Sequence, residues 1–515
     1  MTTAALEVER KYDVDTTVTL PDLDGLSGVA ATTEPAVHQL VAHYVDTADL
    51  RLRAAGVTLR HRSGGNDAGW HLKLPLGDDR EELGVPGDDP TAPVPEELQA
   101  LVRALVRTRP LAPVARLTTR RTVRRLLDDA GLVLVEVVDD EVRGELLGVD
   151  QASPVVWREW EAELGTAPRS LLDEVERRLL AAGAVRSTTS SKVGRVLAGR
   201  PVEPGEPAWW SATSSRPSSA GEVVQAHLRA QVDELVDRDP QVRRDLPDAV
   251  HKARVATRRL RSALRTFRPL VDRTVTDPLR VELRWLAGVL GEARDVEVLH
   301  ARLRRLLHAE PPELVMGPVA ERVDTVLGRR YRDAHARAVA VLDDPRYLSL
   351  LDDLEQLVQA PPFSDAARGP AVEVLAPLVT RSWRSLDRTM RAAERADGPE
   401  RDELLHEARK HAKAARYAAE SVEPAFGCDA TRFARAMEEL QEVLGEHQDG
   451  IVLRAALREL GAASSRSGEN GFTFGRLHGL EQARAETAYA RWPKVRKSAS
   501  RRRLRRWLRE ATSGR

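Results

Sequence analysis

The chain changes its hydrophobic period at a segment rich in proline, serine and glycine, RPVEPGEPAWWSATSSRPSSAGE (200–222). Before this segment, short stretches alternate apolar and polar residues and are interrupted by turn signals such as SGGNDAG, which predicts antiparallel strands. After it, long stretches rich in Leu, Ala, Arg and Glu repeat with a period near 3.6, which predicts helices. A length of 515 residues also exceeds what one ordinary core holds. We therefore expect an α+β domain over 1–200, a linker over 201–217 and an all-helical domain over 218–515.

The balance of charges argues against a chain that coats nucleic acid along its whole length. The 79 Lys and Arg residues are matched by 79 Asp and Glu residues, although local basic patches remain compatible with this balance. The single cysteine, Cys428, excludes an internal disulfide, and we expect it to be buried. The sequence has no apolar signal segment and no run of about 18 apolar residues. We therefore expect a cytoplasmic protein that does not bind membranes.

The helical part contains a segment, HKARVATRRLRSALRTF (251–267), with seven potential cations and no acidic residue. At about 100° per residue, spacings of three and four place five of these cations on one stripe of a helix. Small apolar residues with the same spacing, displaced by two positions, form the opposite face. The stripe consists of His251, Arg254, Arg258, Arg261 and Arg265. On its own, such a stripe indicates no more than a solvated helix face.

The same stripe occurs a second time. The segment HEARKHAKAARYAAE (406–420) begins 155 residues after His251 and repeats its cations as His406, Arg409, Lys413 and Arg416. The pair LGEARDVEVLHARL and LGEHQDGIVLRAAL is separated by 154 residues, from Leu290 to Leu444. Two nearly equal separations predict two duplicated helical bundles. Packing alone would preserve the apolar face but has no reason to preserve the His-x-x-Arg face.

Two cationic stripes that face one another across a groove repel unless an anion lies between them. A polyanion is therefore the expected partner. The last segment, 491–510, adds ten basic residues and one acidic residue, with Leu504, Trp507 and Leu508 as an apolar edge. Aromatic residues make up only 4% of the chain, so few side chains are available to stack on bases. These features favour a phosphate chain without bases over nucleic acid.

The stripes, LGEARD, LGEHQD and HEARKHAKAARY over about 218–515 resemble the CHAD domains, helical modules with duplicated bundles. The resemblance implies binding of inorganic polyphosphate rather than catalysis. The implied polyphosphate-binding residues are His251, Arg254, Arg258, Arg261, Arg265, Arg294, His406, Arg409, Lys410, Lys413, Arg416, Tyr417 and His447. One departure is that Glu420 stands where the first copy has Arg265, which shortens the second stripe.

Several predicted strands of the first part carry charges of one sign on one face. The segment LEVERKY places Glu7, Glu9 and Lys11 on the same face, and WREWEAEL aligns three carboxylates. The segments VTLRHR and WHLKLP align cations instead. A solvated sheet usually mixes both signs. If these faces line a barrel interior, carboxylates would hold Mg²⁺ or Mn²⁺ and Arg and Lys would bind phosphate oxygens, which is chemistry for a triphosphate.

The ordered set EVERK, VTLRHR, WHLKLP, LTTRRTVRRL, VEVVDDEV, WREWEAEL and SSKVGRVL resembles the CYTH, or triphosphate tunnel metalloenzyme, family over nearly all of 5–200. The resemblance implies an eight-stranded closed antiparallel tunnel that hydrolyses a triphosphate. It assigns catalysis to Glu7, Glu9 and Lys11, metal binding to Glu7, Glu9, Asp140, Glu161 and Glu163, and triphosphate binding to Lys11, Arg60, Arg62, Lys73, Arg121 and Lys192. Glu136, Asp139 and Asp140 compete for one ligand position, and Glu159 is an additional carboxylate.

Together, the two resemblances predict a triphosphatase that uses Mg²⁺ or Mn²⁺, acts on inorganic tripolyphosphate or a similar small triphosphate, and is tethered to a module that binds inorganic polyphosphate. Such a protein would be free in the cytoplasm or associated with polyphosphate granules. Two alternatives are a non-catalytic polyphosphate-binding protein and an adenylyl cyclase acting on ATP. The complete set of carboxylates disfavours the first alternative, and the lack of a purine-binding feature disfavours the second.

Overall fold

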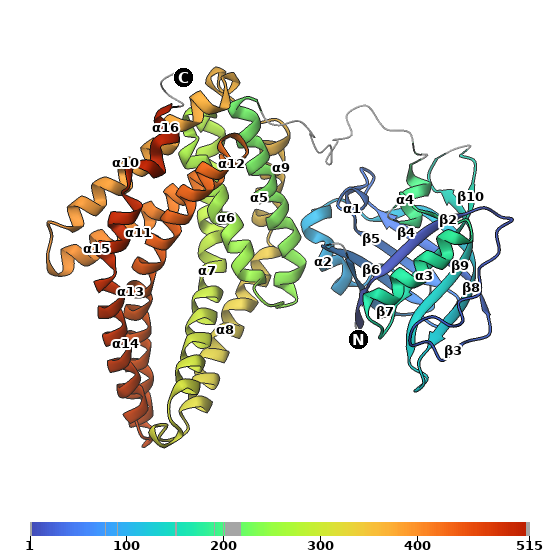
Figure 1. Cartoon of the computed structure of the whole chain (residues 1–515), viewed down its shortest axis with the longest axis horizontal. Coiled ribbons are helices and arrows are strands. Elements are labelled where there is room, and N and C mark those ends of the chain that lie inside the picture. The colour runs from blue at the N-terminus through green and yellow to red at the C-terminus, as the bar shows by residue number, and fades with distance from the viewer. Residues whose placement is uncertain are drawn as a thin grey trace. The chain divides into compact units, whose positions relative to one another are not determined.

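A computed structural model describes residues 3–77, 79–89, 91–149, 152–189, 191–198, 200 and 218–510. It divides the chain into two compact units, Met1–Ala212 and Thr213–Arg515, which are considered separately (Figure 1). The linker predicted for 201–217 lies outside the described residues. None of the helices in the described ranges is both long and apolar enough to span a membrane.

The first unit is built on one antiparallel sheet. Its strands are β1 (Thr3–Glu7), β2 (Glu9–Val14), β3 (Ala31–Thr32), β4 (Ala36–Asp46), β5 (Thr58–Ser63), β6 (Gly69–Leu76), β7 (Asp79–Pro86), β8 (Ala112–Leu127), β9 (Val133–Leu146), β10 (Val155–Leu164) and β11 (Val185–Arg186). The strand order is β1-β7-β6-β5-β4-β8-β9-β10-β2-β11, and β3 pairs with β8. Only Val8 separates β1 from β2, yet β1 pairs with β7 and β2 pairs with β10. The sheet therefore curves into a tunnel-like half-barrel.

The predicted number of eight strands is not confirmed, because the sheet contains eleven. Two of the additional strands, β3 and β11, are only two residues long. The third arises because the segment predicted as one strand is divided at Val8 into β1 and β2. The prediction of an antiparallel β unit followed by a helical unit is confirmed.

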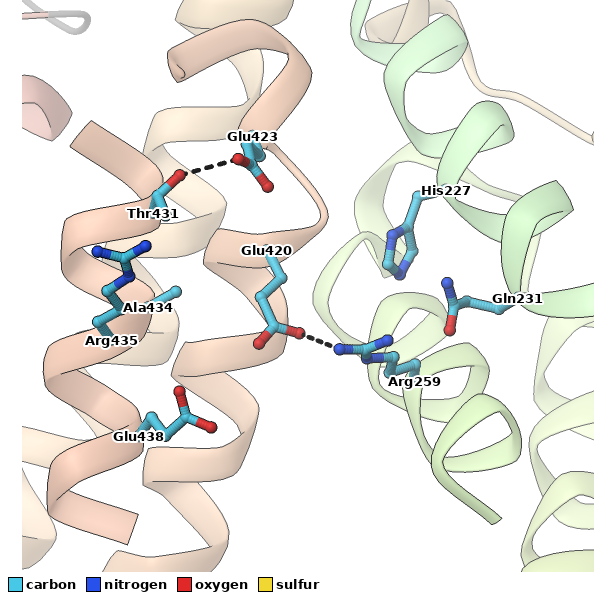
Figure 2. A pocket seen from close by; sticks show the side chains of 9 residues that line it. All are labelled: His227, Gln231, Arg259, Glu420, Glu423, Thr431, Ala434, Arg435 and Glu438. Carbon is cyan, nitrogen blue, oxygen red and sulfur yellow. Dashed lines mark hydrogen bonds and ion pairs between the residues drawn. The ribbon is translucent and has the colours of Figure 1, made fainter. Parts of the chain in front are cut away.

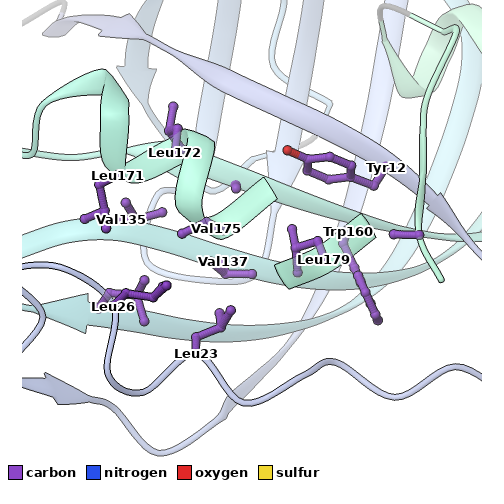
Figure 3. Close-up of a cluster of buried hydrophobic side chains, with 13 residues drawn as sticks. Tyr12, Leu23, Leu26, Val135, Val137, Trp160, Leu171, Leu172, Val175 and Leu179 are labelled. Atoms are coloured by element: carbon purple, nitrogen blue, oxygen red, sulfur yellow. The ribbon is translucent and has the colours of Figure 1, made fainter. Parts of the chain in front are cut away.

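Helices cover the outer face of the sheet and form the core of this unit with it. The helices on this face are α1 (Arg51–Ala54), α2 (Glu96–Val106) and α3 (Arg169–Ala181), whereas α4 (Lys192–Leu197) packs against inward-facing residues at one end of the half-barrel. Helix α3 places Val175 and Leu179 on a buried cluster that includes Tyr12 and Trp160 (Figure 3), and α2 packs on a second cluster around Leu72. Because side chains alternate along a strand, burying the apolar residues under helices turns the charged residues to the inner face.

The second unit consists of helices. They are α5 (Ala220–Arg243), α6 (Ala249–Thr266), α7 (Arg273–Ala309), α8 (Val319–Leu342), α9 (Pro345–Gln359), α10 (Ala371–Ala393), α11 (Gly398–Glu420), α12 (Glu423–Phe426), α13 (Cys428–Arg466), α14 (Phe472–Ala490), α15 (Trp492–Ala499) and α16 (Arg506–Glu510), with the 3₁₀ turns η1 (Arg268–Leu270), η2 (Pro312–Leu314), η3 (Asp365–Arg368) and η4 (Arg502–Arg505). Helix α5 begins with a capping box between Ser219 and Glu222.

The helices form two sets that contact each other. Helices α5 to α8 pack in succession, as do α10, α11, α13 and α14 (Figure 1). Helix α6 contacts α11, and the cluster around Leu303, Val323 and Leu457 joins α7 and α8 to α13. The predicted apolar stripe of α6 is confirmed, since Ala256 and Leu260 are fully buried. Small residues on this stripe let neighbouring helices approach closely.

The basic C-terminal segment is anchored by its apolar residues. Trp507 and Leu508 are buried, and the Trp507 ring lies 4.5 Å from the ring of Phe426. The Arg505 guanidinium lies 3.9 Å from the ring centre of Trp383 in α10. The prediction for Cys428 is wrong, because this residue is exposed where α13 begins.

Candidate functional site

Charged side chains line a cavity of about 190 Å³ inside the half-barrel. Among the predicted tunnel residues, the cavity is lined by Glu7, Glu9, Lys11, Arg60, Arg62, Lys73, Arg121, Glu161, Glu163 and Lys192. Asp140 is fully buried behind this lining. The sequence analysis left out Tyr44, Thr58, Asp67, Arg80, Glu82 and Ser191, which also line the cavity. The sequence therefore indicated most of the lining.

Strand register brings carboxylates and cations from different strands together. Lys11 on β2 lies opposite Glu161 on β10, and its ammonium contacts that carboxylate and lies 3.0 Å from Glu9 Oε2. Lys73 on β6 donates to both oxygens of Glu7, at 2.8 and 2.6 Å. Each carboxylate of the EVERK signature is thus held by a lysine inside the cavity.

Asp140 forms the centre of a buried charge network. Its neighbours in register are Arg121 on β8 and Glu159 on β10. Arg121 donates two hydrogen bonds to Asp140, at 2.9 and 2.6 Å, and a third to Glu161 at 3.0 Å. Lys192 at the start of α4 places its ammonium 3.1 Å from Asp140, 2.6 Å from Glu159 and 2.7 Å from Glu161. Buried carboxylates at this density require such partners.

Three of these carboxylates form a group suited to a hard metal ion. Asp140, Glu159 and Glu161 are buried, and each offers an oxygen within 4.8 Å of those of the other two. Carboxylate oxygens are the ligands that Mg²⁺ and Mn²⁺ prefer. The group differs from the predicted metal set, because it includes the additional carboxylate Glu159. The predicted residues Glu7, Glu9 and Glu163 line the cavity outside this group.

The competition among Glu136, Asp139 and Asp140 is reduced by the alternation of β9. Both oxygens of Asp139 accept from Arg158, at 2.8 and 2.7 Å. Glu136 and Asp140 lie on the opposite side of the strand, where Glu136 lines the cavity. Asp139 is therefore excluded as a ligand inside the tunnel, and the other two remain candidates.

Part of the cavity holds more negative charge than its cations compensate. Burial and the neighbouring Glu82 raise the pKa of Glu7 to about 8, and burial also raises the pKa of Glu163. In contrast, although burial opposes ionisation, the nearby Lys11 holds the pKa of Glu9 below its usual value. A bound cation favours the ionised form of a carboxyl group. The region of Glu7 and Glu163 is therefore electrostatically suited to a cation.

Three arginines, Arg60, Arg62 and Arg121, crowd together in another part of the cavity, and each has a carboxylate partner. Burial and the neighbouring Arg60 and Arg121 lower the pKa of Arg62. The Arg60 guanidinium donates to the hydroxyl of Tyr44 at 3.1 Å, and despite its burial, Tyr44 has a lowered pKa because of Arg60. Crowded cations of this kind are stabilised by an anion.

Helix α4 packs into one end of the half-barrel. Its residues Val193 and Val196 contact inward-facing residues of the strands, including Leu117 and Val142. The contact with β9 is so close that a Cβ atom at Gly144 would lie 2.3 Å from Val196. This helix therefore blocks the interior at that end and positions Lys192.

In the helical unit, the two cationic stripes approach each other where α6 meets α11. The Arg258 guanidinium lies 5.4 Å from the ring centre of Tyr417. Burial, together with Arg409, Arg258 and Arg254, lowers the pKa of Lys413 to about 7. Like charges from both helices thus crowd around Lys413, and we call the surface between the stripes the basic groove.

The repeated LGE motifs support the repeated stripe arginines. In α6, Arg254 lies against Gly291 and donates to Asp295 at 2.8 Å. In α11, Arg409 lies against Gly445 and donates to Asp449 at 3.3 Å. The glycine leaves room for the guanidinium, and the aspartate four residues later fixes its direction. This explains why both motifs pair a glycine with an aspartate.

Several predicted groove residues are neutralised by neighbours. Arg294 pairs with Glu297 at 3.0 Å, and Lys410 with Glu407 at 2.6 Å. Arg416 pairs with Glu420 at 2.6 Å and with Glu438 at 2.8 Å. Glu420 occupies the position of Arg265 in the first repeat, so this difference between the repeats neutralises Arg416. Burial lowers the pKa of both predicted histidines, His251 and His406. The side chain of His447 lies outside the described residues.

Four stripe cations remain without a carboxylate at ion-pair distance in the part of the chain that the structure describes. They are Arg258, Arg261, Arg265 and Lys413. Arg261 also has Arg284 of α7 nearby, a cation that the sequence analysis did not include. These uncompensated charges define the anion-binding potential of the basic groove.

Comparisons with known proteins place two domains on the chain. A CYTH domain matches residues 5–196, and a CHAD domain matches residues 226–458. Two curated relatives from Mycobacterium tuberculosis, the uncharacterized proteins MT2285 (strain CDC 1551 / Oshkosh) and Rv2226 (strain ATCC 25618 / H37Rv), are each 38% identical over 499 residues, covering 93% of this chain and 94% of the relative.

Three solved structures are also similar to parts of the chain. PptA from Streptomyces chartreusis is 22% identical with a TM-score of 0.44, covering 54% of this chain and 100% of that chain. The CHAD domain from the plant Ricinus communis is 22% identical with a TM-score of 0.41, covering 58% and 95%. The putative adenylyl cyclase HpAC1 from Hippeastrum is 17% identical with a TM-score of 0.23, covering 38% and 97%.

Proposed function

Because the chain belongs to the family of two-domain proteins in which a CYTH domain precedes a CHAD domain, we propose that it is a metal-dependent triphosphatase. Its substrate is inorganic tripolyphosphate or a similar small triphosphate. Its helical unit binds inorganic polyphosphate in the basic groove. The observation that carries the catalytic part is the separation of charge in one cavity, where carboxylates suited to a metal lie beside crowded arginines.

The carboxylates and the cations of the cavity have different roles in the proposed reaction. Asp140, Glu159 and Glu161 would hold Mg²⁺ or Mn²⁺, with Glu7 and Glu9 as further oxygen ligands. When bound, the metal supplies positive charge for the phosphate oxygens and activates a water for attack on phosphorus. The cations bind and orient the phosphate chain and stabilise the charge that develops on its oxygens. They are Lys11, Arg60, Arg62, Lys73, Arg121 and Lys192.

The dimensions of the cavity favour a short substrate. A volume of about 190 Å³ accommodates a small phosphate chain, and α4 blocks one end of the half-barrel. A long polymer would therefore reach the carboxylates only with its terminal phosphates. On this basis, long-chain polyphosphate is a ligand of the basic groove rather than the main substrate of the tunnel.

Two finer features of the fold support these roles. We infer that the tunnel wall closes, since the segment that contains both β1 and β2 pairs with β7 through β1 and with β10 through β2. The contact of Arg254 with Asp295 recurs as that of Arg409 with Asp449, which supports the predicted duplication of the helical sets. Duplication provides the two cationic walls that a phosphate polymer requires.

A substrate comparison tests the proposed activity. The protein is incubated with tripolyphosphate, ATP or long-chain polyphosphate in Mg²⁺ or Mn²⁺, and phosphate, pyrophosphate and cyclic AMP are measured. We expect phosphate and pyrophosphate from tripolyphosphate. Cyclic AMP with pyrophosphate from ATP would identify a cyclase instead. An absence of product from all three substrates would leave only polyphosphate binding.

The affinity for polyphosphate is expected to fall as the pH rises through 7. The pKa of Lys413 is about 7 in the free protein, and a bound polyanion favours its protonated form. Below pH 7, Lys413 is already charged, whereas above it each binding event must take up a proton. We expect a loss of up to about tenfold per pH unit, measured by titration calorimetry in buffers of different ionisation enthalpy. The variant Lys413→Gln should flatten this dependence, and an unchanged profile would contradict the assignment.

A further inference from the structure

The helical unit contains a cavity of about 380 Å³ that none of the predicted groove residues lines (Figure 2). One wall belongs to α5 and α6 and presents His227, Gln231 and Arg259. The facing wall belongs to α11, α12 and α13 and includes Glu420 and Glu423. The cavity therefore lies between the two helical sets.

The carboxylates are confined to the wall formed by α11, α12 and α13. Arg259 crosses the cavity and donates to Glu420 at 2.9 Å, and Arg416 pairs with Glu420 and Glu438. Glu423 accepts a hydrogen bond from the hydroxyl of Thr431 at 2.9 Å. No Lys, Arg or His within the described ranges lies at ion-pair distance from Glu423. This carboxylate is thus a free negative charge at the cavity.

The opposite wall contains buried polar atoms without hydrogen-bond partners among the described residues. The Nε2 atom of His227 and the Oε1 atom of Gln231 are buried and have no hydrogen-bond partner among the described residues. They lie one helical turn apart on α5, so both face the cavity. Burial, with Arg259 nearby, lowers the pKa of His227 to about 4, so its ring is neutral near pH 7 and has one acceptor nitrogen. Buried polar atoms without partners are destabilising, and a bound donor removes this penalty.

We propose that this cavity binds a small linear diamine, with one ammonium group at Glu423 and the other at Gln231 and His227. An ammonium group can donate three hydrogen bonds, and its positive charge would provide the ion-pair partner that Glu423 lacks among the described residues. Of the three carboxylates in the lining, Glu420 pairs with Arg259 and Arg416, and Glu438 pairs with Arg416, so Glu423 is the carboxylate without an ion-pair partner among the described residues.

Other ligand classes fit this lining less well. An anion would meet Glu423 and the Oε1 atom of Gln231, and the Nη2 atom of Arg259 already donates to Glu420, although the buried Nε atom of Arg259 has no hydrogen-bond partner among the described residues. A directly coordinated metal needs several carboxylate oxygens close together. Within the described chain, the one such group is Asp140, Glu159 and Glu161 of the first unit. The chemistry of the helical cavity therefore favours an organic cation.

Titration calorimetry of the full-length protein with 1,4-diaminobutane tests this proposal. We expect saturable binding near pH 7 and a loss of affinity of about tenfold or more in Glu423→Gln and in Gln231→Leu, since hydrogen bonds to charged groups have this strength. Glu439→Gln removes one exposed carboxylate from α13 outside the cavity and should bind as the wild type does. Thermal melting without ligand shows whether each variant is folded.

Three outcomes would overturn the proposal. One is the absence of saturable binding. Another is an equal loss of affinity in Glu423→Gln and Glu439→Gln, which would indicate that the diamine is attracted non-specifically to acidic residues on the surface. The third is displacement of the diamine by Mg²⁺ at similar concentration, which would indicate a divalent-cation site. Tripolyphosphate hydrolysis should be unaffected in all three variants, so this test is independent of the proposed catalytic function.

Discussion

Replacing Glu7 and Glu9 together by glutamine is expected to lower the kcat of tripolyphosphate hydrolysis by at least about 100-fold, because metal ions contribute several kcal/mol to such reactions. Glutamine keeps the size of each side chain but removes the charge that binds a cation. Both carboxylates line the cavity, and their lysine partners would lose their counter-charges. Steady-state release of phosphate over a range of Mn²⁺ concentrations measures the effect.

The matched control for this prediction is Glu141→Gln. Glu141 is on β9 close to Asp140 in sequence, but it is exposed and pairs with Arg120 on the surface of the sheet. We expect its activity to equal that of the wild type. If the double variant is folded by circular dichroism and retains wild-type kcat, the tunnel carboxylates do not take part in the reaction.

Reversing the charges of Arg258 and Lys413 together is expected to abolish retention of long-chain polyphosphate while leaving tripolyphosphate turnover unchanged. Arg258 comes from α6 and Lys413 from α11, so Arg258→Glu with Lys413→Glu puts repulsion on both walls of the basic groove. Neither residue has a carboxylate partner in the described part of the chain, so the substitutions break no ion pair. Two lost charge-assisted hydrogen bonds alone correspond to about 100-fold or more in affinity.

The control for this variant reverses two exposed arginines of α8, Arg329→Glu with Arg332→Glu. This change alters the net charge equally but lies outside the basic groove. Electrophoretic retention by polyphosphate should be lost only in the groove variant. If this variant still binds, its affinity should depend less on salt concentration than that of the wild type. Equal retention by both variants would mean that the stripes are ordinary solvated faces.

Hydrophobic period and strand alternation predicted much of this organisation. The ordinary alternation of β2 places Glu9 and Lys11 on one face and Tyr12 on the other, and the structure buries Tyr12 under α3 while the charged pair lines the cavity. Similarly, the period of α6 separated its alanines from its cations, and the alanines are buried. These are properties of single elements, so they are visible in a single segment.

Partners across elements could not be read from the sequence. Glu82 lies in DREELGVP, which mixes charges of both signs and gives no signal for a site, although the pairing of this strand with β6 brings Glu82 within 3.9 Å of Lys73. Arg416 was included in the stripe because of its spacing, although Glu438 of α13 helps to neutralise it. In both cases a residue from another element decides the role.

The sequence by itself determined which side chains share a face, because backbone geometry sets the directions of successive side chains within one strand or helix. Only the tertiary structure decided that Lys192 reaches Asp140, Glu159 and Glu161, and that the face of β9 turned to the tunnel is that of Asp140 rather than that of Asp139. These contacts depend on the register between distant strands and on the packing of α4 into the half-barrel. Register and packing are set by the whole core at once, so no single motif specifies them.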